Sequence, residues 1–88
     1  MAHGPSLIVG EAMFGDEFTI TGTTSITSIL DAGTRSEGRI VTLRFNSTLT
    51  FTDGSNLVLA GNFSTSANDT ITLRCMNGAW LELSRSVN

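Results

Sequence analysis

Few residues in this chain are of the types that carry out catalysis. The only histidine, His3, lies in the first six residues, so a Ser–His or Cys–His pair would lack a dependable base. Two carboxylates roughly 5–10 Å apart could hydrolyse glycosides. The acidic residues, however, occur mainly in turn-like stretches, where local backbone hydrogen bonds account for them: Asp31, Glu37, Asp53 and Asp69. We therefore expect no enzymatic activity and no catalytic residue, metal site or cofactor.

The lone cysteine, Cys75, alternates with Leu73 and Ile71, which places it on the apolar face of a predicted strand. There a thiol acts as a small hydrophobic group, and without a second cysteine it cannot form an internal disulfide. A chain of 88 residues buries only a small apolar area on folding, so its free energy of unfolding is expected to be small. With no disulfide to help, we expect the chain to associate with copies of itself.

The composition restricts the class of protein. Of the 88 residues, 40% are hydrophobic and 15% are charged, with a net charge of −3. This is too apolar for a disordered chain, and no apolar run approaches the roughly 18 residues that would span a membrane. The five cations are all arginines and are scattered, which argues against nucleic acid as a partner. One folded domain without membrane insertion is predicted.

Abundant Thr, Val, Ile and Phe, with Gly and Asn between apolar runs and no Lys or Gln, predict an all-β fold. We expect short antiparallel strands in a small sandwich, a jelly-roll-like fold or an interwoven domain. Residues 1–6 are interpreted as an expression remnant or the cut edge of a longer chain, and residues 7–88 as one β domain. The predicted strands are Leu7–Val9, Phe18–Thr21, Ser25–Leu30, Arg39–Phe45, Leu49–Thr52, Leu57–Leu59, Asp69–Cys75 and Ala79–Ser84.

The last two strands are predicted to form a hairpin around Asn77-Gly78. A two-residue loop would mix apolar and polar partners, because it sets Leu73 opposite Glu82. A three-residue loop with Gly78 in the left-handed conformation separates them, and a one-residue slip moves every side chain to the other face. We therefore predict the longer loop. Its apolar pairs are Cys75 with Ala79, Leu73 with Leu81, and Ile71 with Leu83.

In this register Trp80 lies opposite Arg74 on the less apolar face, beside Glu82. Three interpretations stay open for this cluster. It could be a contact between subunits, a cross-strand pair that only stabilises the hairpin, or a platform on which a sugar stacks against Trp80.

Two upstream segments show the same alternation of apolar and polar residues. Five apolar residues share one face if the loop at residues 46–48 has an odd length: Val41, Leu43, Phe45, Leu49 and Phe51. Asp53-Gly54 begins a turn that leads into Leu57–Leu59, which is apolar on both faces. That strand is predicted either to be central or to have its outer face, with Val58, covered by another chain.

Four strings in a fixed order resemble a known family. They are TGTTSITSI from Thr21, GRIVTLRF from Gly38, DGSNLVL from Asp53, and NDTITLRC from Asn68, the last followed by Asn77-Gly78, Trp80 and Ser84-Arg85-Ser86. Over about residues 18–88, this order resembles the small C-terminal β domain of bacteriophage tailspikes and tail fibres, which is often attached to a right-handed β-helix.

The resemblance implies a homotrimeric terminal domain of a virion protein. Members of this family attach to bacterial surface polysaccharide or degrade it, and their catalytic residues lie in the β-helix, so none transfers to this chain. Assembly in the host cytoplasm suits a domain without disulfides. A carbohydrate-binding module, with Trp80 as its stacking residue, is the alternative function.

Overall fold

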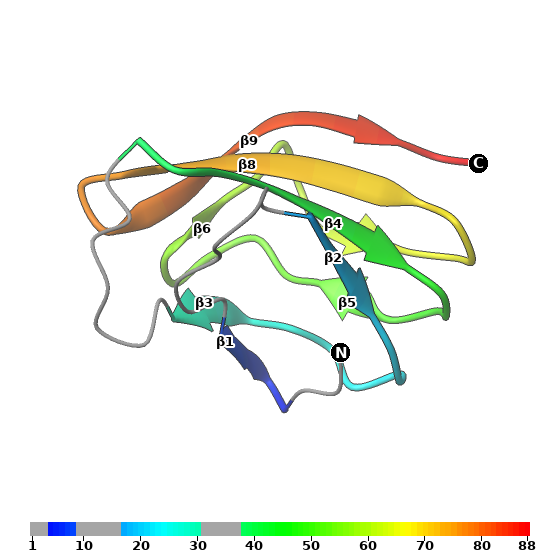
Figure 1. Ribbon diagram of the computed structural model, residues 1–88. Helices are drawn as coiled ribbons and strands as arrows, with labels where there is room; N and C mark the ends of the chain where they lie inside the picture. Colours follow the sequence, from blue (N-terminus) through cyan, green and yellow to red (C-terminus); the bar gives the residue numbers. More distant parts are fainter. Residues whose placement is uncertain (1–3, 9–16, 31–37) are drawn as a thin grey trace.

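The computed structural model describes residues 4–8, 17–30 and 38–88 (Figure 1). The all-β prediction is confirmed: the described residues form short strands and no helix, and so none that could cross a membrane. The strands are β1 (Ser6–Ile8), β2 (Glu17–Ile20), β3 (Ser28–Leu30), β4 (Ile40–Phe45), β5 (Thr50–Phe51), β6 (Leu57–Val58), β7 (Phe63–Ser64), β8 (Thr70–Met76) and β9 (Ala79–Ser86). Among these strands, only the short β7 has no counterpart in the sequence-based prediction.

The largest sheet has the strand order β2-β4-β8-β9-β6, and two small sheets pair β1 with β3 and β5 with β7. In Figure 1, β1, β3 and β5 lie across the molecule from β8 and β9. The expectation of purely antiparallel strands is wrong, because β1-β3, β2-β4 and β6-β9 are parallel pairs. Between the two strands of each pair the chain passes through at least one strand of another sheet, and it then returns in the same direction.

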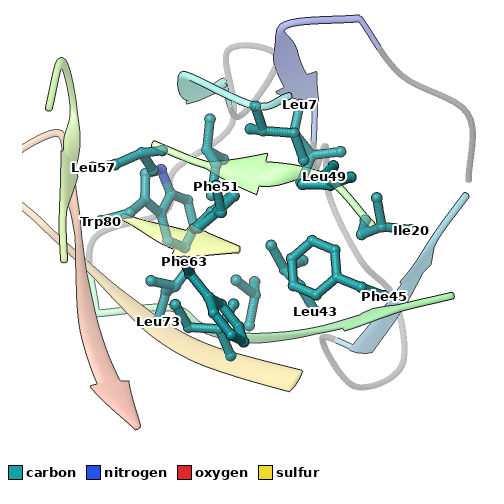
Figure 2. Packing of buried hydrophobic residues seen from close by; sticks show 14 of the residues in the cluster. Leu7, Ile20, Leu43, Phe45, Leu49, Phe51, Leu57, Phe63, Leu73 and Trp80 are labelled. Carbon is teal, nitrogen blue, oxygen red and sulfur yellow. The ribbon is translucent and has the colours of Figure 1, made fainter. Parts of the chain in front are cut away.

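One apolar core fills the space between the sheets (Figure 2). Alternate residues of β4 and β8 are buried, as the period of two in the sequence predicts. The Phe45 ring packs against Phe51 and Phe63, with ring centroids 5.9 and 6.0 Å away. The predicted burial of Cys75 is also confirmed. Buried apolar residues from every sheet take part: Leu7, Ile20, Ile26, Ile29, Val41, Leu43, Phe45, Leu49, Phe51, Leu57, Phe63, Ile71, Leu73, Cys75 and Trp80.

The expectation that residues 41–45 and 49–51 share one face through the loop at residues 46–48 is wrong. The five residues assigned to that face are all buried, but β4 and β5 belong to different sheets and do not pair. The buried hydroxyl of Thr65 fastens the connection between them: it donates to the Ser47 carbonyl (2.8 Å) and accepts from the Leu49 N–H (3.1 Å). After β4 the chain crosses to the sheet that contains β5. The same residues are buried there as in a hairpin of β4 and β5.

The three-residue loop predicted for the C-terminal hairpin is also wrong. Asn77 and Gly78 alone form the turn, with φ angles of 54° and 80°, and Met76 pairs with Ala79. Both residues in the left-handed region are typical of a type I′ turn. This short loop sets Leu73 opposite Glu82, which mixes an apolar and a charged residue on one face. Beyond that pair the register shifts by one residue, between Thr72 and Leu73.

The segment at Leu57–Leu59 is an edge strand, so its interpretation as a central strand is wrong. Leu57 faces the core, whereas Val58 is exposed. At the other end of the chain, Pro5 and Ser6 take part in the fold, so the placement of these two residues outside the β domain is wrong. The Pro5 carbonyl accepts the Thr27 N–H (2.8 Å), and Ser6 pairs with Ser28. His3, Asp31 and Glu37 lie outside the described residues.

Candidate functional site

Trp80 lies in the core, so its predicted position on the less apolar face of the hairpin is wrong. It is 2% exposed and pairs with Cys75 on one side and Leu57 on the other. Figure 2 shows its indole among Leu57, Phe51 and Phe63. The two-residue turn is the cause, because it places Trp80 opposite the inward-facing Cys75. A sugar therefore cannot stack on this side chain in the folded chain.

The predicted cluster of Trp80, Arg74 and Glu82 does not form. Arg74 is exposed and pairs with Leu81, on the face of the sheet that points away from the core. Glu82 pairs with Leu73 and lies on the inner side with Trp80. The structure separates the arginine from the other two residues.

Glu82 instead forms an ion pair with Arg85, a residue that the sequence analysis did not single out. The guanidinium donates from Nε to Oε2 (2.6 Å) and from one terminal nitrogen to Oε1 (2.7 Å). That nitrogen also donates to the Gly61 carbonyl (3.0 Å), and the guanidinium lies 4.6 Å from the centroid of the Phe63 ring. The Glu82 carboxylate also accepts the Ala60 N–H (2.8 Å). The pair thus fastens the segment before β7 to β9.

Each member of the ion pair shifts the pKa of the other in the direction that favours its charged form. The hydrogen bonds from Arg85 hold the pKa of Glu82 below its usual value, against the opposing effect of burial, and the Ala60 N–H adds to this. Glu82 in turn raises the pKa of Arg85. Both groups are therefore charged at neutral pH, and both are occupied by partners within the chain, which makes this a structural ion pair.

Asp69 is buried and its carboxylate is also fully used. Oδ2 accepts the backbone N–H (2.9 Å) and the hydroxyl (3.0 Å) of Ser66, and Oδ1 accepts the Asn88 N–H (2.8 Å). The hydrogen bond from Asn88 is the main reason that the pKa of Asp69 is lowered, although burial acts in the opposite direction. This carboxylate connects the segment before β8 to the segment after β9.

The residues predicted to form the Asp53-Gly54 turn do lie in a turn. The Asp53 carboxylate accepts the Leu59 N–H (2.9 Å), and Gly54 exchanges two backbone hydrogen bonds with Leu57 (2.9 and 2.8 Å). Gly54 has a φ of 131°, a conformation that favours glycine. Within residues 4–8, 17–30 and 38–88, no group of three or more His, Cys, Asp or Glu side chains could hold a metal ion.

The outer face of the five-stranded sheet carries exposed apolar side chains that lie close together. Ile40, Arg74, Leu81 and Val58 are successive partners across β4, β8, β9 and β6. Met76 lies beside them next to the hairpin turn. We call these five residues the hairpin-end patch. Ile40 is 48% exposed, Val58 51% and Met76 38%, so a large apolar area surrounds the Arg74 side chain.

The rest of this face is hydroxyl-rich. Thr42, Thr72 and Ser84 form the next row of partners, and Arg44, Thr70 and Ser86 form the row after it. The hydroxyls of Thr42 and Thr72 are 3.1 Å apart and hydrogen bonded. Apolar and hydroxyl side chains are therefore segregated along the strands, and this segregation distinguishes the hairpin-end patch from an ordinary solvated sheet face.

Comparison with known proteins adds no relative. The sequence matches no family model, no curated protein and no solved structure. The candidate site is therefore defined by the chain's own geometry: an exposed, largely apolar patch around one arginine on the outer sheet face.

Proposed function

We propose that this chain is the terminal domain of a bacteriophage tailspike or tail fibre, where it holds three identical chains in register in the virion. It contributes to attachment at the host surface by maintaining the assembly. The chemistry of any polysaccharide degradation belongs to a separate β-helix of the parent protein. The proposal is supported by the ordered strings between residues 18 and 88 and by the all-β fold in which they lie.

The observation that carries the proposal is the hairpin-end patch. Three of its side chains, those of Ile40, Val58 and Met76, are more than a third exposed and lie together on one face of the sheet, whereas Leu83 and Val87 are the other exposed large apolar residues of the described chain. Burial contributes roughly 25 cal/mol per Å² of apolar area. A few hundred Å² covered by a neighbouring copy would therefore rival the total stability of about 5–15 kcal/mol of a small domain. A threefold assembly supplies such cover to every copy.

Sedimentation equilibrium of this chain at micromolar concentration tests the proposal directly. We expect the mass of a trimer. A monomer over the whole concentration range would overturn the proposed function, because a domain that holds three chains in register must associate.

The alternative function, a carbohydrate-binding module built on Trp80, loses its stacking residue in this structure. Phe45, Phe51 and Phe63 are buried with Trp80, and Phe18 is partly buried against the core. The described part of the chain thus offers no fully exposed aromatic ring to a sugar. We therefore do not assign sugar recognition to the hairpin.

A further inference from the structure

We infer that a second copy of this chain packs on the hairpin-end patch and that Glu17 of that copy forms an ion pair with Arg74. This inference rests on the proposed function, since it names the contact that joins the copies. Arg74 and Glu17 are the two charged side chains that support it, because neither has an ion-pair partner within the described residues.

Arg74 is the described arginine whose side chain has no partner within the described residues. Arg85 binds Glu82, Arg44 donates to the Asn68 side chain (2.6 Å), and Arg39 lies over the Phe18 ring at 6.0 Å from its centroid. Arg74 is exposed in the middle of apolar side chains. Any surface that covers the patch must also cover this guanidinium.

Covering a charge without a partner is costly, because the lost hydration is not replaced. An apolar partner surface would therefore bind the patch poorly. A surface that brings a carboxylate to Arg74 restores the interaction, and arginine–carboxylate hydrogen bonds are among the strongest in proteins. The occupant must therefore combine apolar area with one accessible carboxylate.

Glu17 is the described carboxylate that fits this requirement. Asp53 accepts the Leu59 N–H, Asp69 accepts Ser66 and Asn88, and Glu82 binds Arg85. Glu17 is exposed at the start of β2, where it pairs with Thr42 and so lies on the same outer face of the sheet. No side-chain partner of Glu17 exists within the described residues.

The two unused charges lie on strands that are not neighbours in the sheet. Glu17 is on β2 and Arg74 is on β8, with β4 between them. Two strand spacings amount to about 10 Å, and Arg74 lies a further two residues along the sheet from the Thr72 that aligns with Glu17. The complementary charge for Arg74 is therefore available on a second copy. A contact of this kind uses two different regions of the surface, as a closed ring of three requires.

Charge reversal tests the pair. Sedimentation equilibrium is measured for the unchanged chain, for Arg74→Glu, for Glu17→Arg and for the double variant that carries both. Each single reversal places like charges together and should weaken association at least about tenfold, whereas the double variant should recover most of this loss. Arg44→Glu is the matched control: it changes the net charge equally on the hydroxyl-rich part of the same face and should alter association less than about twofold.

Circular dichroism and melting at a concentration where all variants have the same mass verify that each one folds. If the unchanged chain is a trimer but the single reversals associate normally, or the double variant is as weak as the singles combined, the Glu17–Arg74 contact is wrong and the proposed function stands. If Arg44→Glu weakens association as much as Arg74→Glu, a general charge effect replaces the specific contact. A monomeric unchanged chain overturns the contact together with the proposed function.

Discussion

Glu82 and Arg85 lie on the same side of β9 although they are three residues apart, a spacing that places side chains on opposite sides of a regular strand. The reason is the β-bulge in the β8–β9 hairpin. Leu73 pairs with Glu82 and Thr72 pairs with Ser84, so Leu83 is an extra residue and is 54% exposed. The bulge turns Arg85 to the inner side, where it neutralises Glu82 beside the core. Inward-pointing charges and a bulge also discourage pairing of this strand with other chains.

Replacing Glu82 by Gln should lower the free energy of unfolding by about 2 kcal/mol, because Arg85 would keep its buried contacts without a counter-charge. Urea denaturation measures the loss. The double variant Glu82→Gln, Arg85→Met should lose less than the sum of the two single variants, since no uncompensated charge remains. Strictly additive effects would contradict a coupled ion pair.

Gly78→Val should destabilise the protein by roughly 1–2 kcal/mol or more, because a β-branched residue strains the backbone at a φ of 80°. No atom lies within 4 Å of the added Cβ, so the cost is one of backbone conformation rather than of crowding. Asn77→Gly is the control and should be nearly neutral, since glycine accepts the φ of 54° at that position. A Gly78→Val variant that melts like the parent would exclude the type I′ turn.

Trp80→Ala should lower the free energy of unfolding by about 3–5 kcal/mol, the range expected when a large buried aromatic is removed. Trp80→Phe keeps much of the packing and should lose less. Thermal melting followed by circular dichroism provides the comparison. A small effect of Trp80→Ala would mean that the indole is on the surface, as the three-residue loop requires.

Acid should destabilise the fold through Asp69 and Glu82. Both pKa values are lowered on folding from ordinary values of 3.8 and 4.5, so the stabilisation is complete above those values. It is lost as the pH falls through the lower folded-state pKa values, where the carboxylates become protonated and release their donors. The urea concentration at the unfolding midpoint, measured between pH 7 and pH 2, should decrease as the solution becomes acidic. Asp69→Asn should flatten this dependence, and an unchanged slope in that variant would contradict the role of Asp69.

Folding and association should be one transition, with a melting temperature that rises with protein concentration. Since Trp80 is already buried within one chain, the exposure lost on assembly should be that of Val58 and its neighbours in the hairpin-end patch. Val58→Asp should lower the melting temperature at every concentration, because it weakens the association on which folding depends. Ser84→Asp, on the hydroxyl-rich part of the same face, is the control and should melt close to the unchanged chain. A melting temperature constant over a hundredfold range, measured after full equilibration, would contradict the coupling.

The sequence by itself determined where the strands lie and which residues are buried in most of them. Alternation along residues 40–45 and 70–75 is local information, because successive side chains of any strand point to opposite faces. For the same reason the burial of Val41, Leu43 and Cys75 was predicted correctly. The turns at Asp53-Gly54 and Asn77-Gly78 could also be located, since glycine after Asp or Asn favours a reversal of the chain.

Only the tertiary structure decided which strands pair and which side chains share a face. Leu49 and Phe51 would be buried equally well in a hairpin with β4 or in the facing layer, and the choice depends on distant contacts such as those of Thr65. The position of Trp80 depends on the two-residue turn, and the pairing of Glu82 with Arg85 depends on the extra residue at Leu83. One inserted residue moves every later side chain of the strand to the other face of the sheet. The position of the insertion is set by packing across strands rather than by the types of the neighbouring residues.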